Sequence, residues 1–319
     1  MAKRIFSFFY ILFLPYCVFA ESLFPVKLEG KWGYINRDGK IVVNPDFDAA
    51  LNFSEEMGAV KKGNKWGFVD KKGRILGELN YDAVLPFSEG LAAVKIGKKW
   101  GFINKKGKLV IEPQFEMASG FFDGLAAVKA GKKWGYIDKK GRITIKPNFT
   151  YAFDFSEGLA RVIMGGRVGY IDKNGKNVIP PKFEGGGNFS EGLAWVLFDG
   201  KFGYIDKNGK IVINFQFDDA WSFSEGLAAV EVSNKCGYID RNGNFVIPLS
   251  FDGCGRFSYG YAWVIIDEKF GYIDRTGKIV LEPKFDSADD FSEGVALVGI
   301  DGKYGYINYR FEFIWQPSK

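Results

Sequence analysis

Acidic side chains recur along this chain every 34 residues, a regularity that suggests metal binding or acid–base catalysis. One series occupies the motif Phe-Ser-Glu-Gly and its variants: Glu55, Glu89, Asp123, Glu157, Glu191, Glu225 and Glu293. Calcium requires several oxygen ligands, and a single carboxylate per unit supplies too few. Glycoside hydrolysis requires one differentiated pair of carboxylates, which near-identical units do not offer. We therefore expect the glutamate to cap a turn, and we expect no enzyme activity and no cofactor.

A second series places an aspartate or asparagine four residues before the start of the third strand expected in each unit: Asn36, Asp70, Asn104, Asp138, Asp172, Asp206, Asp240, Asp274 and Asn308. Asparagine substitutes freely for aspartate here, which argues against a ladder of metal ions. Both residue types accept local backbone hydrogen bonds in turns. We expect turn formation and no metal site.

Histidine is absent from all 319 residues. This excludes Ser-His-Asp and Cys-His catalysis and histidine-ligated metals. The net charge of +5 falls by two, to +3, once Lys3 and Arg4 are removed with the leader described below. So small an excess predicts neither nucleic acid nor a membrane surface as partner.

The amino terminus has the pattern of a secretory signal. Lys3 and Arg4 precede an apolar run that ends in Val18-Phe19-Ala20. We expect residues 1–20 to be a signal peptide cleaved after Ala20, and the mature protein to be periplasmic, at the cell surface or extracellular, without a membrane span. Lipid attachment at Cys17 is a weaker alternative, because Tyr16 is bulkier than the residue such sites require.

One β unit repeats nine times without insertion. A Trp-Gly pair begins at Trp32, Trp66, Trp100 and Trp134, and Val, Phe, Cys, Phe and Tyr take the tryptophan position in the later units. In the third unit, residues 91–96, 99–104 and 108–111 read as three strands joined by tight turns, and residues 112–124 connect to the next unit. We expect a single array over residues 21–319, with repeats covering about 23–315.

The hairpin register can be tested within the sequence. A two-residue turn places Lys95 opposite Trp100, and where the tryptophan is lost the partner changes as well, as in Ile163/Val168 and Leu197/Phe202. A lysine stem over an indole is a favourable contact. Joint variation of the two positions predicts that they are cross-strand neighbours on one face of the sheet.

The units resemble the WG repeat family of bacterial proteins, also called KWG repeats. The resemblance rests on Lys-Trp-Gly-Tyr/Phe-Ile-Asp/Asn-x-x-Gly, Pro-x-Phe-Asp and Phe-Ser-Glu-Gly-Leu-Ala, which are nearly complete in residues 133–141 and 155–160. Units five to nine depart from the pattern by losing tryptophan. The resemblance implies a repeat scaffold and no particular activity.

Two all-β architectures are compatible with these units, which are too small to be stable alone. One is an open β superhelix or solenoid of three-stranded antiparallel meanders. The other is a closed β-propeller, with residues 115–121 as a fourth strand. Propeller blades usually take about 40 residues, and no split unit is visible to close a ring. The sequence therefore favours the open form.

Variation within the first strand of each unit suggests a binding surface. One face becomes more apolar in the carboxy-terminal half, at Arg161, Ile163, Trp195, Leu197, Trp263 and Ile265. These residues could form a patch for a protein or an envelope polymer, or they could repack the core where tryptophan is lost. The first interpretation predicts a noncatalytic scaffold, with a glycan-binding module or a structural envelope protein as alternatives.

Two cysteines remain in the mature chain, and their positions suggest a disulfide. Cys236 stands in the tryptophan position of unit seven, and Cys254 lies 18 residues further on, where other units carry a small residue. An exported protein meets oxidising conditions. We expect the two side chains to lie together and to be able to form a bond.

Overall fold

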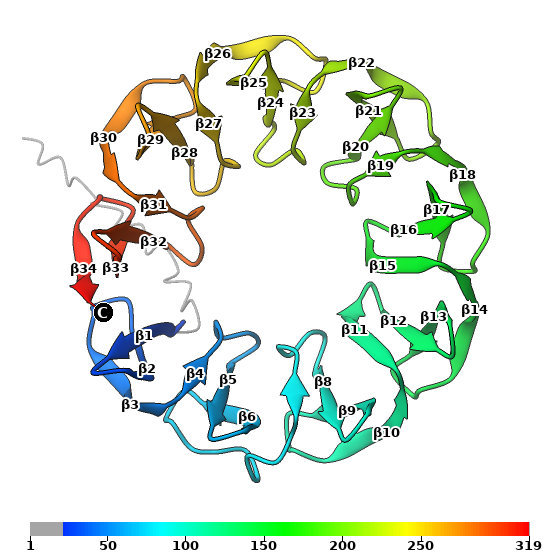
Figure 1. The fold of residues 1–319 in the computed structure, drawn as a ribbon, viewed down its shortest axis with the longest axis vertical. Coiled ribbons are helices and arrows are strands. Elements are labelled where there is room, and N and C mark those ends of the chain that lie inside the picture. Colours follow the sequence, from blue (N-terminus) through cyan, green and yellow to red (C-terminus); the bar gives the residue numbers. More distant parts are fainter. Residues whose placement is uncertain (1–21, 319) are drawn as a thin grey trace, which may run out of the picture.

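The computed structural model describes residues 22–318, which form a closed ring of nine small β-sheets around a central opening (Figure 1). The predicted signal peptide and Cys17 lie outside these residues. No helix of the described chain is long and apolar enough to cross a membrane. Each sheet is one blade, and we number the blades 1 to 9 in chain order.

A blade contains up to four antiparallel strands, ordered from the central opening to the circumference (Figure 1). Most inner strands have only two residues, and β11 and β15 have six: β4 (Ala49–Ala50), β7 (Ala83–Val84), β11 (Met117–Phe122), β15 (Tyr151–Ser156), β19 (Gly185–Gly186), β23 (Asp219–Ala220), β27 (Gly253–Cys254) and β31 (Ser287–Ala288). The second strands are β1 (Phe24–Leu28), β5 (Met57–Lys62), β8 (Leu91–Ile96), β12 (Leu125–Ala130), β16 (Leu159–Met164), β20 (Leu193–Phe198), β24 (Ala228–Val232), β28 (Tyr261–Ile266) and β32 (Val295–Ile300).

The third strands carry the Trp-Gly position and its replacements. They are β2 (Lys31–Ile35), β6 (Lys65–Asp70), β9 (Lys99–Asn104), β13 (Lys133–Asp138), β17 (Arg167–Asp172), β21 (Lys201–Asp206), β25 (Lys235–Ile239), β29 (Lys269–Asp274) and β33 (Lys303–Asn308). The outer strands are β3 (Ile41–Phe47), β10 (Leu109–Phe115), β14 (Ile143–Phe149), β18 (Asn177–Phe183), β22 (Ile211–Phe217), β26 (Phe245–Phe251), β30 (Ile279–Phe285) and β34 (Phe313–Ser318). In blade 2 two isolated bridges, Trp66↔Tyr81 and Val69↔Ile75, replace the outer strand.

Turn chemistry shapes each blade as the sequence predicts. In blade 3 the turn between β8 and β9 begins with Gly97 at φ 61°. In the next turn the Asn104 side chain accepts the backbone N–H groups of Lys106 and Lys108, at 2.9 and 3.1 Å. The aspartate or asparagine series therefore builds turns. The glycine after tryptophan serves close packing, because a Cβ on Gly101 would lie 2.4 Å from the Ile111 carbonyl oxygen of β10.

The predicted cross-strand register is confirmed. Lys95 pairs with Trp100, Ile163 with Val168 and Leu197 with Phe202. Each of these pairs therefore shares one sheet face, the face that lies against the next blade.

The hydrophobic core lies between blades. Nine apolar clusters each combine side chains from two adjacent blades, and the ninth joins Phe24, Val26 and Ile35 of blade 1 to Val295 and Tyr306 of blade 9. In seven interfaces a buried tyrosine hydroxyl also donates a hydrogen bond to a main-chain carbonyl of the next blade. These tyrosines are Tyr34, Tyr136, Tyr170, Tyr204, Tyr238, Tyr272 and Tyr306.

The expected open superhelix is wrong, because the array closes into a nine-bladed β-propeller. Thirty-four residues suffice because most inner strands need only two residues, and because the segment expected to be a connection extends the outer strand to Phe115. Among the described residues, closure involves no shared strand. The Tyr306 hydroxyl donates to the Pro25 carbonyl at 3.0 Å, and Arg37 forms an ion pair with Glu293 at 3.1 Å.

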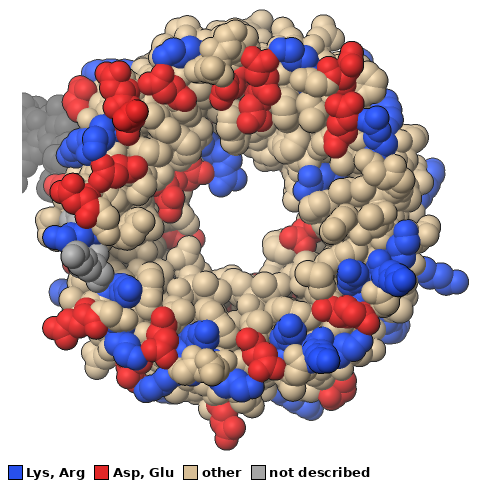
Figure 2. Space-filling view, viewed as in Figure 1, with Lys and Arg blue, Asp and Glu red and all other residues tan. Residues whose placement is uncertain are grey.

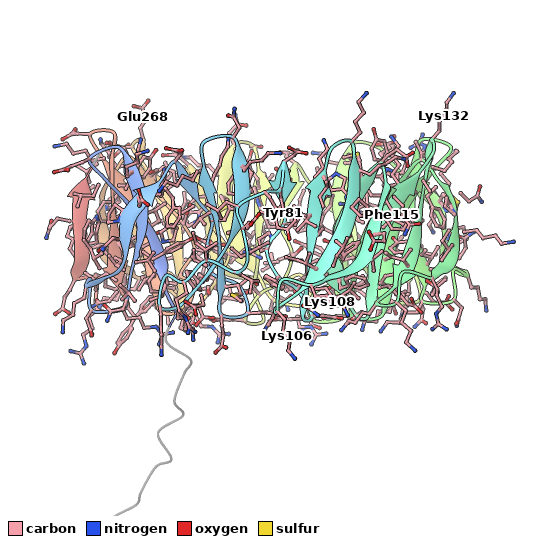
Figure 3. All side chains as sticks on the ribbon, turned by 90° about the horizontal axis from the view of Figure 1, so that it is seen from below. Tyr81, Lys106, Lys108, Phe115, Lys132 and Glu268 are labelled. Atoms are coloured by element: carbon pink, nitrogen blue, oxygen red, sulfur yellow. A yellow bond between two sulfur atoms is a disulfide. The ribbon has the colours of Figure 1, made fainter. Side chains whose placement is uncertain are left out.

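One face of the ring carries a repeated acid–hairpin link. The acid that follows the outer strand pairs with a lysine or arginine of the blade it leaves, and accepts a backbone N–H from the first hairpin of the blade it enters. Asp252 shows this, with Lys235 Nζ at 2.6 Å and the Asp267 N–H at 3.2 Å. Seven acids share the arrangement: Asp48, Asp82, Glu116, Glu184, Asp218, Asp252 and Asp286. Figure 3 shows Lys132 and Glu268, from these hairpins, on one face of the ring, and Lys106 and Lys108 on the other.

We predict that acid destabilises the ring through these links. The hydrogen bond from the lysine or arginine is the main cause that lowers the pKa of all seven carboxyl groups. In Asp252 and most of the others, the hydrogen bond from the hairpin N–H is the second cause. A pKa lowered by folding gives stability that is present above the unfolded value, about 4, and is lost as pH falls through the folded value. The melting temperature should therefore fall steeply below about pH 4. The double variant Asp218→Asn/Asp252→Asn should show a smaller fall, and an equal fall would contradict the assignment.

We also predict that the inter-blade tyrosines stabilise the ring. Tyr204→Phe removes the donor to the Trp221 carbonyl, 2.8 Å away, and should lower the free energy of unfolding by about 1–3 kcal/mol because a buried acceptor loses its partner. Urea denaturation measures the change. Tyr309→Phe is the control, because Tyr309 is 54% exposed, and equal effects of the two variants would refute the prediction.

Candidate functional site

The other face of the ring reveals what the Phe-Ser-Glu-Gly motif does. The glutamate lies in a left-handed turn, and its carboxylate accepts the N–H of the corresponding glycine in the next blade, as Glu191 does from Gly226 at 2.9 Å. The serine donates to a carbonyl of the same neighbour, as Ser190 does to Phe223 at 2.7 Å. The expected turn is present, but the motif also clasps two blades together. One signal in the sequence pointed to this role. The motif recurs every 34 residues, but no residue within its own unit is an evident partner for the glutamate.

The clasp changes around blades 8, 9 and 1. Tyr259 occupies the glutamate position of blade 8 at φ 55° and is 52% exposed. In blade 9, Glu293 accepts hydrogen bonds from Ser22 Oγ at 3.0 Å and from Arg37 at 3.1 Å. The interface between blades 9 and 1, which we call the seam, is therefore built differently from the repeating interfaces.

Blade 1 has three strands within the described residues, without an inner strand before β1. By the 34-residue register the corresponding positions are 15 and 16, outside the described range. Elsewhere the inner strand of the next blade covers the tryptophan position, and Trp134 and Val168 are 9% and 3% exposed. At the seam Tyr304 holds this position and is 55% exposed.

A cavity of about 690 Å³ lies at the seam. Blade 1 and the loop after β4 contribute Phe24, Trp32 and Phe53 to its wall, and blade 9 contributes Leu297, Tyr304, Tyr306 and Trp315. Small-molecule sites in proteins have this size and this mixture of aromatic and polar lining. Strand β1 packs against Val295 and Tyr306 of blade 9, whereas none of the described residues covers Tyr304. The cavity forms beside this uncovered ring. The seam cavity is thus the candidate functional site.

Acidic groups dominate its polar lining. Asp289, Asp290 and Glu293 line the seam cavity, and Lys27 is the one basic residue among the described residues of its wall. Asp290 pairs with Arg256 at 3.1 Å, and Glu293 pairs with Arg37. Partial burial and the neighbouring Asp290 raise the pKa of Asp289. The same acidic loop borders a second cavity of about 610 Å³, which Tyr259 and Trp263 also line.

Comparison with known proteins supports the repeat assignment. A family model described as WG containing repeat matches eight consecutive segments: 32–66, 66–100, 100–134, 134–167, 169–202, 202–236, 237–270 and 270–304. The chain belongs to this WG repeat family. No curated protein sequence matches the chain significantly.

Solved structures align with this WG repeat protein at low sequence identity. A crystal structure of a eukaryotic initiation factor aligns with a TM-score of 0.67 and 15% identity, covering 92% of this chain and 94% of that one. Hsv2 from Kluyveromyces lactis aligns with a TM-score of 0.45 and 11% identity over 72% of this chain and 95% of its own. The first match supports the ring-shaped fold alone, and the second is too distant to carry an argument.

The predicted binding patch is divided among three interfaces of the WG repeat ring. Arg161 and Ile163 lie on β16 against blade 6, Trp195 and Leu197 on β20 against blade 7, and Trp263 and Ile265 on β28 against blade 9. All six side chains are partly buried. The structure therefore brings them together as three separate pairs rather than as one surface, and Trp263 alone also lines a cavity.

Local packing explains why the WG repeats carry these large side chains. A Cβ on Gly187 would lie 2.3 Å from Trp195 Nε1, and a Cβ on Gly255 would lie 2.2 Å from Trp263 Nε1. Where the strand carries alanine, the same position holds a larger residue, such as Leu85 beside Ala93 or Trp221 beside Ala229. Arg161 lies 3.6 Å from the centroid of the Phe153 ring. Each exchange preserves the filling of one inter-blade interface.

The predicted cysteine pair is confirmed. Cys236 on β25 and Cys254 on β27 form a disulfide with a Cα–Cα distance of 6.0 Å, within the normal range. Both residues are buried, and the bond joins blade 7 to blade 8. In the interface between blades 5 and 6, Val168 packs against Gly186 in the same two repeat positions. A covalent bond thus replaces the packing of a larger side chain on a small one.

We predict that reducing this bond lowers the free energy of unfolding by about 3 kcal/mol, because it closes a loop of roughly 18 residues in the unfolded chain. Urea denaturation with and without reductant measures the loss. The double variant Cys236→Ala/Cys254→Ala should not respond to reductant. Two titratable thiols in the unfolded, unreduced protein would show that the bond does not form.

Proposed function

We propose that this WG repeat propeller is a noncatalytic binding scaffold that is exported and holds a protein or polymer partner at the bacterial envelope. The observation that carries this proposal is the seam. Eight interfaces repeat one scheme of apolar packing, whereas at the ninth the residues that the structure describes leave an aromatic and acidic cavity open. Specific recognition needs a surface that differs from its surroundings, and the seam provides one within an otherwise repetitive ring.

The acidic series supports a noncatalytic role. The motif glutamates from Glu55 to Glu225 clasp neighbouring blades, and the turn aspartates accept backbone N–H groups. These side chains are thereby committed to the architecture. Within residues 22–318, no group of three or more His, Cys, Asp or Glu side chains is placed so that it could hold a metal ion.

The exposed aromatic side chains favour a scaffold over a glycan-binding module. A glycan site would align aromatic platforms along one groove. Instead, the exposed rings lie on inner, second, third and outer strands and in turns of different blades: Phe122, Tyr151, Phe198, Phe245, Tyr259, Tyr304 and Tyr309. Figure 2 shows acidic and basic side chains intermixed over the visible face, without one dominant sign. The disulfide is consistent with an oxidising compartment.

The proposal can be tested by affinity capture with a matched pair of variants. The purified exported chain is immobilised and exposed to envelope extract, in parallel with Tyr304→Ala and Tyr309→Ala. Both tyrosines belong to blade 9 and are equally exposed, at 55% and 54%, but only Tyr304 lines the seam cavity. We expect a partner that is lost with Tyr304→Ala and retained with Tyr309→Ala. Identical capture by all three chains would refute the seam as the binding site.

A further inference from the structure

The seam cavity combines an apolar wall with a carboxylate that lacks a counter-ion. Within residues 22–318, the side chain of Asp289 has no hydrogen-bond or ion-pair partner, whereas its neighbours Asp290 and Glu293 are paired with Arg256 and Arg37. Asp289 follows the inner strand β31 and accepts the Tyr272 hydroxyl only through its backbone carbonyl, at 2.8 Å. Its carboxylate is therefore available to a ligand.

The position of Asp289 in the repeat directs it toward the aromatic wall. The corresponding residue in blade 6, Gly187, contacts the side chain eight positions later, Trp195. In blade 9 that later position is Leu297, which lines the seam cavity together with Asp289. The charge and the apolar surface thus lie on one side of blade 9, facing blade 1.

The edge of β1 argues against a partner strand as the occupant. In most other blades, strand β8 or its equivalent accepts main-chain hydrogen bonds from the inner strand, as Ala93 does from Leu85 at 2.9 Å. In β1 the equivalent residue is Pro25, which has no N–H, and its carbonyl already accepts the Tyr306 hydroxyl. Proline on a strand edge prevents strand addition. The cavity is therefore suited to recognition by side-chain chemistry.

We propose that the seam cavity binds a monocationic amine with an apolar body, its ammonium group at Asp289 and its apolar part against Phe24, Leu297 and Tyr304. Asp290 and Glu293 are paired with arginines, so the unpaired carboxylate of Asp289 supplies the negative charge for the cation, and aromatic faces add attraction. A volume of about 690 Å³ admits an aryl-alkyl amine or a lysine side chain with a neighbouring aromatic residue. This inference deepens the proposed function and rests on it.

Isothermal titration of the purified exported chain tests the ligand class. The probes are phenethylamine, its neutral analogue 2-phenylethanol, and an end-blocked peptide containing one Phe-Lys pair. We expect one site per chain for an amine probe and at least tenfold weaker binding of the alcohol. Binding of the free amine points to a small-molecule ligand, and binding of the peptide alone points to a protein side chain; both results support the proposal.

Variants locate the site. Asp289→Asn should weaken amine binding about tenfold or more, which corresponds to about 1.4 kcal/mol, and should leave binding of the alcohol unchanged. Tyr304→Ala should weaken both probes. Asp199→Asn, at an exposed hairpin of blade 6, should change neither. No binding of either amine probe, equal binding of amine and alcohol, or an unaltered Asp289→Asn chain would overturn the ligand class. Capture of a partner through Tyr304 would still stand as evidence for the scaffold.

Discussion

Each blade depends on its two neighbours, because a small twisted sheet with two apolar faces cannot bury either face alone. All nine core clusters lie between blades, and the largest buried side chains, the tyrosines of the third strands, reach across the interface to main-chain carbonyls of the next blade. Unpaired faces would remain at the two ends of an open array. Closure removes both ends, so the ring is the state in which every sheet face is covered.

Polar side chains at the two rims then fix the alignment of adjacent blades. Acid–hairpin links act on one face and serine–glutamate clasps on the other, and each kind spans a nearly constant number of residues along the chain. These contacts are exposed or partly buried, and individually weak. Their regularity prevents blades from sliding past each other, which the apolar contacts alone, being non-directional, would permit.

Features that depend on residues close together in the chain could be predicted from the sequence, whereas ring closure, which depends on small angles summed over nine blades, could not. The turns at Asn104 and its equivalents, the Lys95–Trp100 register and the Cys236–Cys254 contact follow from spacing and residue type within about twenty positions. Closure depends on the angle between successive blades, which the repeat pattern does not encode visibly. The seam cavity could not be predicted, because it exists only where the first and last blades meet. The division of Arg161, Trp195 and Trp263 among separate interfaces likewise required the ring.

Within residues 22–318 blades 1 and 9 share no strand, and this has a mechanical consequence. Blades 1 and 9 meet through side chains, with Tyr306, Glu293 and Arg37 as polar contacts. Both ends of the described chain lie beside this junction (Figure 1). Tension applied to the two ends would therefore load the seam first and part blade 1 from blade 9, while the disulfide between blades 7 and 8 would hold. The ring would open at the seam cavity.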